Sequence, residues 1–185
     1  MSKRLPVVLL DVDGVLNAIT RKPDPNVWKR WREGTANSGT RDYPIRWAEE
    51  VAEFISDLHT SGRAEVRWHT TWQEYAQTAI EPLLGLPRFE VADAPEFTDR
   101  TYEAAAIAAG RPTWWKLPAA ERVVQQEGRP LIWIDDDMHQ GLRRYDIHEG
   151  FTAHQRTMFV APDEAVGISP RYVRLITEFI DSLED

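Results

Sequence analysis

The sequence predicts an α/β protein of the Rossmann-like type, a three-layer sandwich with a mostly parallel central sheet. Three apolar segments of strand length, residues 5–10, 64–69 and 130–134, are followed by polar residues. Amphipathic segments with helical spacing lie between them. Strands that alternate with helices pair in parallel, and strands apolar throughout are covered on both faces. We therefore expect helices on both sides of one sheet.

The first apolar segment ends in two aspartates and a glycine, Asp11, Asp13 and Gly14. Carboxylates at positions i and i+2 of a strand point to the same side, and they resist joint ionisation unless a cation lies between them. A hard divalent cation with oxygen ligands, Mg²⁺ first, meets this need. Gly14 would allow a sharp turn and bring backbone N–H groups near an anion. An Asp-rich turn without chemistry is the alternative.

A basic and aromatic insertion follows at about residues 18–46. The stretch from Arg21 to Arg46 has a net charge of +4, whereas the whole chain has −8. Segments 27–31 and 43–47 have strand character and could pair as a hairpin around the turn region 34–39. A flap over the strand ends and a solvated loop both fit this pattern.

The middle of the chain has the pattern of a helix, a strand and a second helix. Apolar residues recur at helical spacing over 48–60, and the strand over 64–69 follows. Arg67 and His69 are unusual in a buried strand, so we expect them toward an edge of the sheet unless His69 faces the site. The second helix is expected over 72–83.

The remaining elements follow from the same signals. They are strands over 88–91, 130–134 and 157–160, and helices over 101–109, over 118–127 and from 170 onward. Ser169 and Pro170 are residue types preferred at the N-cap and first position of a helix. Because no repeat or linker interrupts the pattern, we expect one domain over residues 1–185.

The composition excludes several classes of protein. The chain has no cysteine, which excludes disulfides, thiolate zinc sites and a cysteine nucleophile. The apolar run near the N-terminus stops at Asp11, too early for a signal peptide or a membrane span. We therefore expect a cytoplasmic protein without a membrane partner. The net charge of −8 argues against broad binding to duplex nucleic acid.

Three strand ends predict one shared site. In a parallel sheet the carboxyl ends of strands meet at one edge, where ligands bind, and these ends carry Asp11, Thr70 and Asp135. Carboxylates from separate strands, with Asp13 and Asp136 among them, would repel one another strongly. This cluster strengthens the case for a bound Mg²⁺.

The segment Asp11-Val12-Asp13-Gly14-Val15-Leu16 resembles the first motif of the haloacid dehalogenase (HAD) superfamily. Thr70 resembles the second motif, Lys116 the third and Asp135-Asp136 the fourth. More narrowly, four segments resemble small actinobacterial and phage HAD proteins and the HAD modules of RNA-repair proteins. These segments are Trp68-His69-Thr70-Thr71-Trp72, Leu83-Leu84-Gly85-Leu86-Pro87, Lys116-Leu117-Pro118 and Trp133-Ile134-Asp135-Asp136. The resemblance extends from Leu5 to about Leu183 apart from a variable segment over 21–41.

The resemblance implies roles for the catalytic residues. Asp11 would be the nucleophile and Asp13 the general acid and base. The hydroxyl of Thr70 would bind the transferred phosphoryl group, although the adjacent Thr71 could replace it. Lys116 would hold the nucleophile and the phosphate, with Arg111 or Arg122 as alternatives.

The fourth motif would complete the Mg²⁺ site. Asp136 is the first choice for direct contact with the metal, Asp135 the second and Asp137 a weaker third. With Asp11 and Asp13, these residues form the expected ligand set.

These roles imply a phosphatase that acts through an aspartyl-phosphate. No interval is long enough for a large cap domain, and an open site suits a bulky substrate such as a nucleic-acid end. Candidate substrate contacts are Gly14, Thr71, Trp28, Arg30 and Trp31, because basic and aromatic side chains can pair a phosphate backbone and stack a base. A nucleoside monophosphate phosphatase and a non-catalytic nucleic-acid-binding module are the alternatives. Nothing in the sequence indicates an oligomeric state.

Overall fold

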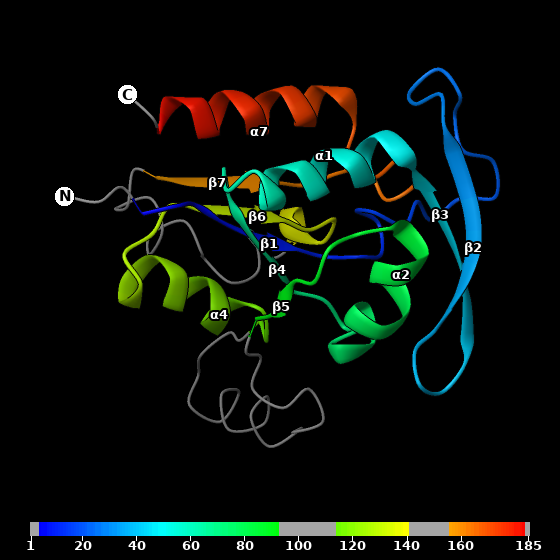
Figure 1. The fold of residues 1–185 in the computed structure, drawn as a ribbon, viewed down its shortest axis with the longest axis horizontal. Helices are drawn as coiled ribbons and strands as arrows, with labels where there is room; N and C mark the ends of the chain where they lie inside the picture. Colours follow the sequence, from blue (N-terminus) through cyan, green and yellow to red (C-terminus); the bar gives the residue numbers. More distant parts are fainter. Residues whose placement is uncertain (1–3, 93–113, 141–155, 184–185) are drawn as a thin grey trace.

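The protein was analysed as a computed structural model, which describes residues 4–92, 114–140 and 156–183 (Figure 1). Its central sheet has five strands in the order β5-β4-β1-β6-β7. The strands are β1 (Val7–Leu10), β4 (Glu65–Trp68), β5 (Glu90–Val91), β6 (Leu131–Ile134) and β7 (Thr157–Val160). Every neighbouring pair is parallel. The predicted α/β class is confirmed.

The two faces of the sheet pack against different helices (Figure 1). Val8 and Leu10 of β1 belong to the core shared with α1 (Glu49–Thr60) and α7 (Pro170–Ser182). Val7 and Leu9 belong to the core shared with α4 (Leu117–Glu121) and the π-helical turn η2 (Arg122–Gln126). Because successive side chains of a strand point to opposite faces, a fully apolar β1 is buried on both sides. The three-layer arrangement is confirmed.

The insertion after β1 contains the hairpin of β2 (Trp31–Asn37) and β3 (Asp42–Ala48). The prediction of a hairpin is confirmed, but the boundaries of its first strand and its turn were wrong, since the reversal falls at residues 38–41. Gly34 pairs with Ile45 inside the hairpin instead of turning the chain. A Cβ atom on Gly34 would lie 2.7 Å from Leu83, so this glycine lets Leu83 pack closely against β2.

The helix expected over 72–83 is found over 74–84, but its middle is a π-helical turn, η1 (Ala76–Ile80), which continues into the short α2 (Glu81–Leu84). The N–H of Glu81 donates to the carbonyl of Ala76, five residues earlier. Pro82 has no N–H with which to continue the α-helical pattern, which favours this wider turn just before it.

The other expected elements within the described ranges are found close to their predicted bounds. The helix expected over 101–109 lies outside the described residues. None of the described helices has both the length and the apolar character needed to cross a membrane.

Candidate active site

The register of the sheet brings three strand ends together. Leu10, the last residue of β1, is level with Trp68 of β4 and Ile134 of β6. The chain continues the pairing past these positions, because Asp11 N–H donates to Ile134 O at 3.1 Å and His69 N–H donates to Leu10 O at 2.8 Å. The residues that follow the strands, Asp11, Thr70 and Asp135, therefore lie at one edge, as predicted.

Lys116 is the cation of this edge. Its side chain is buried, and Nζ donates to Oδ2 of Asp11 and to Oδ2 of Asp135. Burial by itself would lower the pKa of the Lys116 ammonium, but the charges of Asp11 and Asp135 outweigh it and raise the pKa above its usual value. Lys116 is thus a charged contact of the expected nucleophile. Arg122 is in η2, and Arg111 lies outside the described residues.

Three carboxylates lie together at this edge, and two of them, Asp11 and Asp135, contact Lys116. One oxygen atom from each of Asp11, Asp135 and Asp136 lies within 4.8 Å of the others. Burial first, and the charge of Asp11 second, raise the pKa of Asp136 to about 6 and hold the pKa of Asp135 well above its usual range. Carboxylate oxygens are the ligands that Mg²⁺ prefers, and one lysine cannot balance three such charges. The donor set fits a magnesium ion.

Asp136 and Asp135 were the first and second choices for the metal, and both are in this group. Asp137 is exposed and is not in the group; its N–H donates to Oδ1 of Asp135 at 3.0 Å. Gly14 contacts the same region, since a Cβ atom there would lie 2.4 Å from Cγ of Asp136. With φ at +67°, Gly14 combines a left-handed turn with the close approach of its backbone to Asp136.

Asp13 differs from its prediction, because its side chain is not part of the carboxylate group. The argument from a flat strand was wrong: β1 ends at Leu10, and Asp13 is in the turn that follows. Oδ1 of Asp13 accepts a hydrogen bond from Asn17 Nδ2 at 2.7 Å, and Oδ2 accepts one from Trp72 Nε1 at 2.9 Å. These two donors hold both oxygens of the Asp13 carboxylate in place, and its role as acid and base stays a prediction.

His69 and Thr70 follow the last residue of β4, and their side chains have different surroundings. Thr70 is buried at the shared edge, and its hydroxyl accepts the N–H of Trp72 at 3.4 Å, whereas Thr71 is exposed. His69 is buried rather than placed at an open edge of the sheet, and its ring contacts Trp115 and Trp133. Burial first, and then the charge of Lys116, keep the pKa of His69 well below its usual value. His69 is buried because aromatic side chains, Trp115 and Trp133, surround its ring. The sequence alone did not indicate that these residues would contact it.

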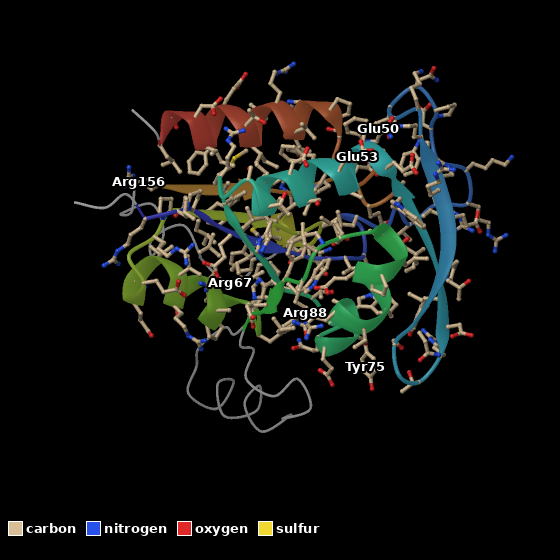
Figure 2. The ribbon with its side chains drawn as sticks, viewed as in Figure 1. Glu50, Glu53, Arg67, Tyr75, Arg88 and Arg156 are labelled. Atoms are coloured by element: carbon tan, nitrogen blue, oxygen red, sulfur yellow. The ribbon has the colours of Figure 1, made fainter. Side chains whose placement is uncertain are left out.

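The expected substrate contacts of the insertion have other partners in this structure. Arg30 pairs with three glutamates of α1, two of which, Glu50 and Glu53, are labelled in Figure 2. The indole N–H groups of Trp28 and Trp31 donate to the carbonyls of Ile168 and Asp24. Within the described ranges, no hydrogen bond or ion pair joins these three side chains to the carboxylate cluster. Their role in substrate binding stays a prediction.

The family model for the HAD domain in Swiss Army Knife RNA repair proteins matches residues 7–173. This span includes the three strand ends, Lys116 and the carboxylate cluster. The chain belongs to this family. A search of curated proteins gave no match. Membership indicates phosphatase-type hydrolase chemistry. The described parts of this HAD domain contain no large cap.

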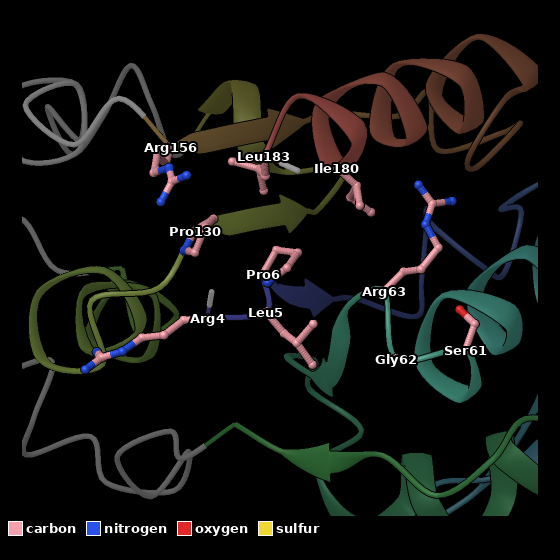
Figure 3. A pocket seen from close by; sticks show the side chains of 10 residues that line it. All are labelled: Arg4, Leu5, Pro6, Ser61, Gly62, Arg63, Pro130, Arg156, Ile180 and Leu183. Atoms are coloured by element: carbon pink, nitrogen blue, oxygen red, sulfur yellow. The ribbon is translucent and has the colours of Figure 1, made fainter. Parts of the chain in front are cut away.

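Two pockets flank the sheet of this HAD domain. One, of about 310 Å³, lies beside the turn that carries Asp13 and is lined by residues 17–21 with Pro44 and Arg46 of the hairpin. The other, of about 280 Å³, is at the opposite edge, where Pro6, Pro130 and Arg156 immediately precede β1, β6 and β7 (Figure 3). Of these two pockets, only the first is lined by a residue, Asn17, that contacts the predicted acid.

Proposed function

We propose that this HAD domain is a Mg²⁺-dependent phosphohydrolase that removes a terminal phosphate from a nucleotide or polynucleotide. The observation that carries the proposal is the buried ammonium of Lys116, which contacts Asp11 and Asp135. These two residues and Asp136 form a carboxylate cluster with the right chemistry for magnesium. A purely structural ion pair would need one carboxylate for this lysine, and the extra ones add only repulsion.

In the first half of the reaction, a carboxylate oxygen of Asp11 attacks the phosphorus atom. The bond between phosphorus and the leaving oxygen breaks, Asp13 gives its proton to that oxygen, and an aspartyl-phosphate forms on Asp11. Asp13 then takes a proton from water as the water oxygen attacks phosphorus. Inorganic phosphate leaves, and Asp11 returns as a carboxylate.

The remaining residues act on the charge of the transferred group. Lys116, the hydroxyl of Thr70 and backbone N–H groups after Asp11 would stabilise its equatorial oxygens. Magnesium held by Asp11, Asp135 and Asp136 would reduce the repulsion between an anionic nucleophile and an anionic substrate.

A nucleic-acid end is the substrate that the family and the shape of the site favour. The matching family model describes domains of RNA repair proteins. In the described ranges, the insertion between β1 and α1 contributes only the β2–β3 hairpin, with no large cap to enclose a small metabolite. The insertion also carries the basic stretch of an otherwise acidic chain.

The test is release of inorganic phosphate from 5′- and 3′-phosphorylated oligonucleotides, nucleoside monophosphates and an aryl phosphate. We expect turnover with Mg²⁺ that stops with EDTA and falls by at least about 10³-fold in Asp11→Asn. Asp137→Asn, which alters an exposed neighbour outside the cluster, is the matched control and should retain activity. Fastest turnover of nucleoside monophosphates would favour the small-metabolite alternative. Oligonucleotide binding without any turnover would favour the non-catalytic module.

A further inference from the structure

The pocket beside Asp13 is connected to the predicted acid through one side chain. Asn17 lines the pocket, its Nδ2 donates to Asp13 at 2.7 Å, and its Oδ1 accepts the backbone N–H of Arg46 at 2.9 Å. The acid must lie next to the oxygen that leaves. We take the part of the substrate attached to that oxygen to extend from Asp13 toward this pocket, because Asn17 joins the two.

The pocket carries two arginines with donors to spare. Arg21 is exposed, and its guanidinium makes no hydrogen bond or ion pair with any residue that the structure describes. Arg46 donates through Nη2 to Glu33 at 2.9 Å, while its Nε is buried without an acceptor in the same described ranges. Nε itself is closed to solvent, but 18% of the Arg46 side chain stays exposed, and a phosphate is the bidentate acceptor that arginine suits best.

The pocket also has an apolar wall. Ile19 lines it with 49% of its surface exposed, one of few large apolar side chains left open to solvent among the described residues. A sugar or base has an apolar face that Ile19 can cover. The pocket therefore combines one apolar contact with two cations, the chemistry that a nucleoside and an adjoining phosphate would need.

From this geometry we propose that the pocket binds the leaving nucleoside together with its next phosphate, held by Arg21 and Arg46. The inference rests on the proposed function and narrows it: the substrate is a polynucleotide end, with a second phosphate one nucleotide from the first. The terminal phosphate lies at Asp11 and the chain leaves past Asp13 and Asn17. A nucleoside monophosphate would fill the pocket only in part.

The experiment compares a phosphorylated dinucleotide with the corresponding nucleoside monophosphate, in 5′- and 3′-phosphorylated forms. Binding is measured by calorimetry on the full chain carrying Asp11→Asn with Mg²⁺ present, so that no turnover interferes. We expect the dinucleotide to bind more tightly, and Arg21→Ala or Arg46→Ala to weaken its binding roughly tenfold. The affinity falls as the salt concentration rises, and each substitution should reduce the steepness of this fall, the slope of log affinity against log salt, by about 0.7.

Two further variants sharpen the result. Arg156→Ala removes the same charge from the pocket at the opposite edge, where Arg156 is equally exposed, and should change nothing. Glu33→Gln removes the partner of Arg46 from an exposed position, frees that guanidinium and should tighten dinucleotide binding. Arg21 and Glu33 are exposed, so these variants test the proposal even if Arg46→Ala fails to fold.

The outcomes separate this proposal from the proposed function. Equal binding of dinucleotide and monophosphate, or equal effects of Arg21→Ala and Arg156→Ala, would overturn the second-phosphate site while phosphatase activity could stand. If the wild-type chain hydrolyses nothing but dinucleotide binding still depends on Arg21 and Arg46, the site stands and the phosphatase does not.

Discussion

Two charged clusters lie along the same sheet and differ in their balance. At the carboxyl ends, the three clustered carboxylates have one ammonium among the described residues, Lys116, which contacts two of them. Toward the amino ends, a second cluster consists of two arginines and two glutamates, namely Glu65, Arg67, Glu127 and Arg129. There Arg67 donates to both oxygens of Glu127 at 2.7 and 2.9 Å and to Glu65 at 2.7 Å. The second cluster has equal numbers of positive and negative charges, and we call it the balanced cluster. The first has more carboxylates than cations among the described residues, and we call it the incomplete cluster.

The pKa shifts of Asp136 in the first cluster and Glu127 in the second have opposite signs, because their surroundings differ in burial and in charge. Burial and the charge of Asp11 raise the pKa of Asp136 to about 6. The hydrogen bonds from Arg67, first, lower the pKa of Glu127. A cluster that holds its carboxylates charged needs nothing more, whereas one that resists their charge gains from a bound cation. From this contrast we infer that the second cluster stabilises the fold and that the first is arranged to bind a cation, as the proposed function requires.

The largest effect on stability is expected from Lys116→Met. The variant leaves Asp11 and Asp135 buried without their cation, so the free energy of unfolding should fall by about 3–5 kcal/mol. Urea denaturation without Mg²⁺ measures this loss. The double variant with Asp135→Asn should recover part of the stability but no activity. If the single variant were as stable as the wild type, the ion pair would not hold the two carboxylates as inferred.

Magnesium should stabilise the wild-type chain by binding the incomplete cluster. At a concentration of one hundred times the Kd, binding adds about 2.7 kcal/mol to the free energy of unfolding. Asp136→Asn should abolish the increase, and Gly14→Ala should weaken it, because the added Cβ atom would meet Asp136. Thermal denaturation with Mg²⁺ or EDTA checks this, with Asp137→Asn as the matched control. An undiminished Mg²⁺ effect in Asp136→Asn would place the ion elsewhere.

Local sequence signals predicted most of the sheet and three of the site positions. The runs that stop at Asp11 and Asp135 are apolar throughout, because both strands are buried on both faces. The run that stops at Thr70 is apolar only at alternate positions. Lys116 could be named only through its resemblance to the HAD pattern, since a single lysine before a helix carries no local signal. Its contacts with Asp11 and Asp135 span more than a hundred and about twenty residues of sequence, respectively.

The position of Asp13 could not be predicted, because it depends on how the chain turns after β1. Its partners are Asn17, four residues later, and Trp72, from the segment after β4. The hairpin boundaries were missed for a similar reason: Gly34 was assigned to a turn, but packing of Leu83 against β2 requires a glycine inside the strand. In both cases a contact between distant segments determined the role of the residue.

The balanced cluster should affect stability without affecting activity. Arg67→Met leaves Glu127 without its bidentate partner, and the free energy of unfolding should fall by about 2 kcal/mol, since hydrogen bonds to charged groups have this magnitude. Adding Glu127→Gln should recover part of the loss. Urea denaturation of the two single variants and the double variant gives the coupling energy. A loss of phosphatase activity larger than the loss of folded protein would contradict the separation of the two clusters.

The smallest expected effect is a dependence of stability on pH that originates in the balanced cluster. The pKa of Glu127 is below the value of about 4.5 for a free glutamate, because Arg67 stabilises its charged form. The stabilisation is therefore fully present above pH 4.5 and is lost as the pH falls through the lower pKa of the folded state. The free energy of unfolding of the wild type should thus decrease below pH 4.5 more steeply than that of Arg67→Met, in which Glu127 has lost this partner. Urea denaturation of both proteins between about pH 3 and pH 6 measures the difference between their free energies of unfolding. The contributions of the other carboxylates are the same in both proteins and cancel in this difference. Parallel curves would mean that the charge of Glu127 gains no net stabilisation from Arg67. The balanced cluster would then stabilise the fold by packing and not by charge pairing.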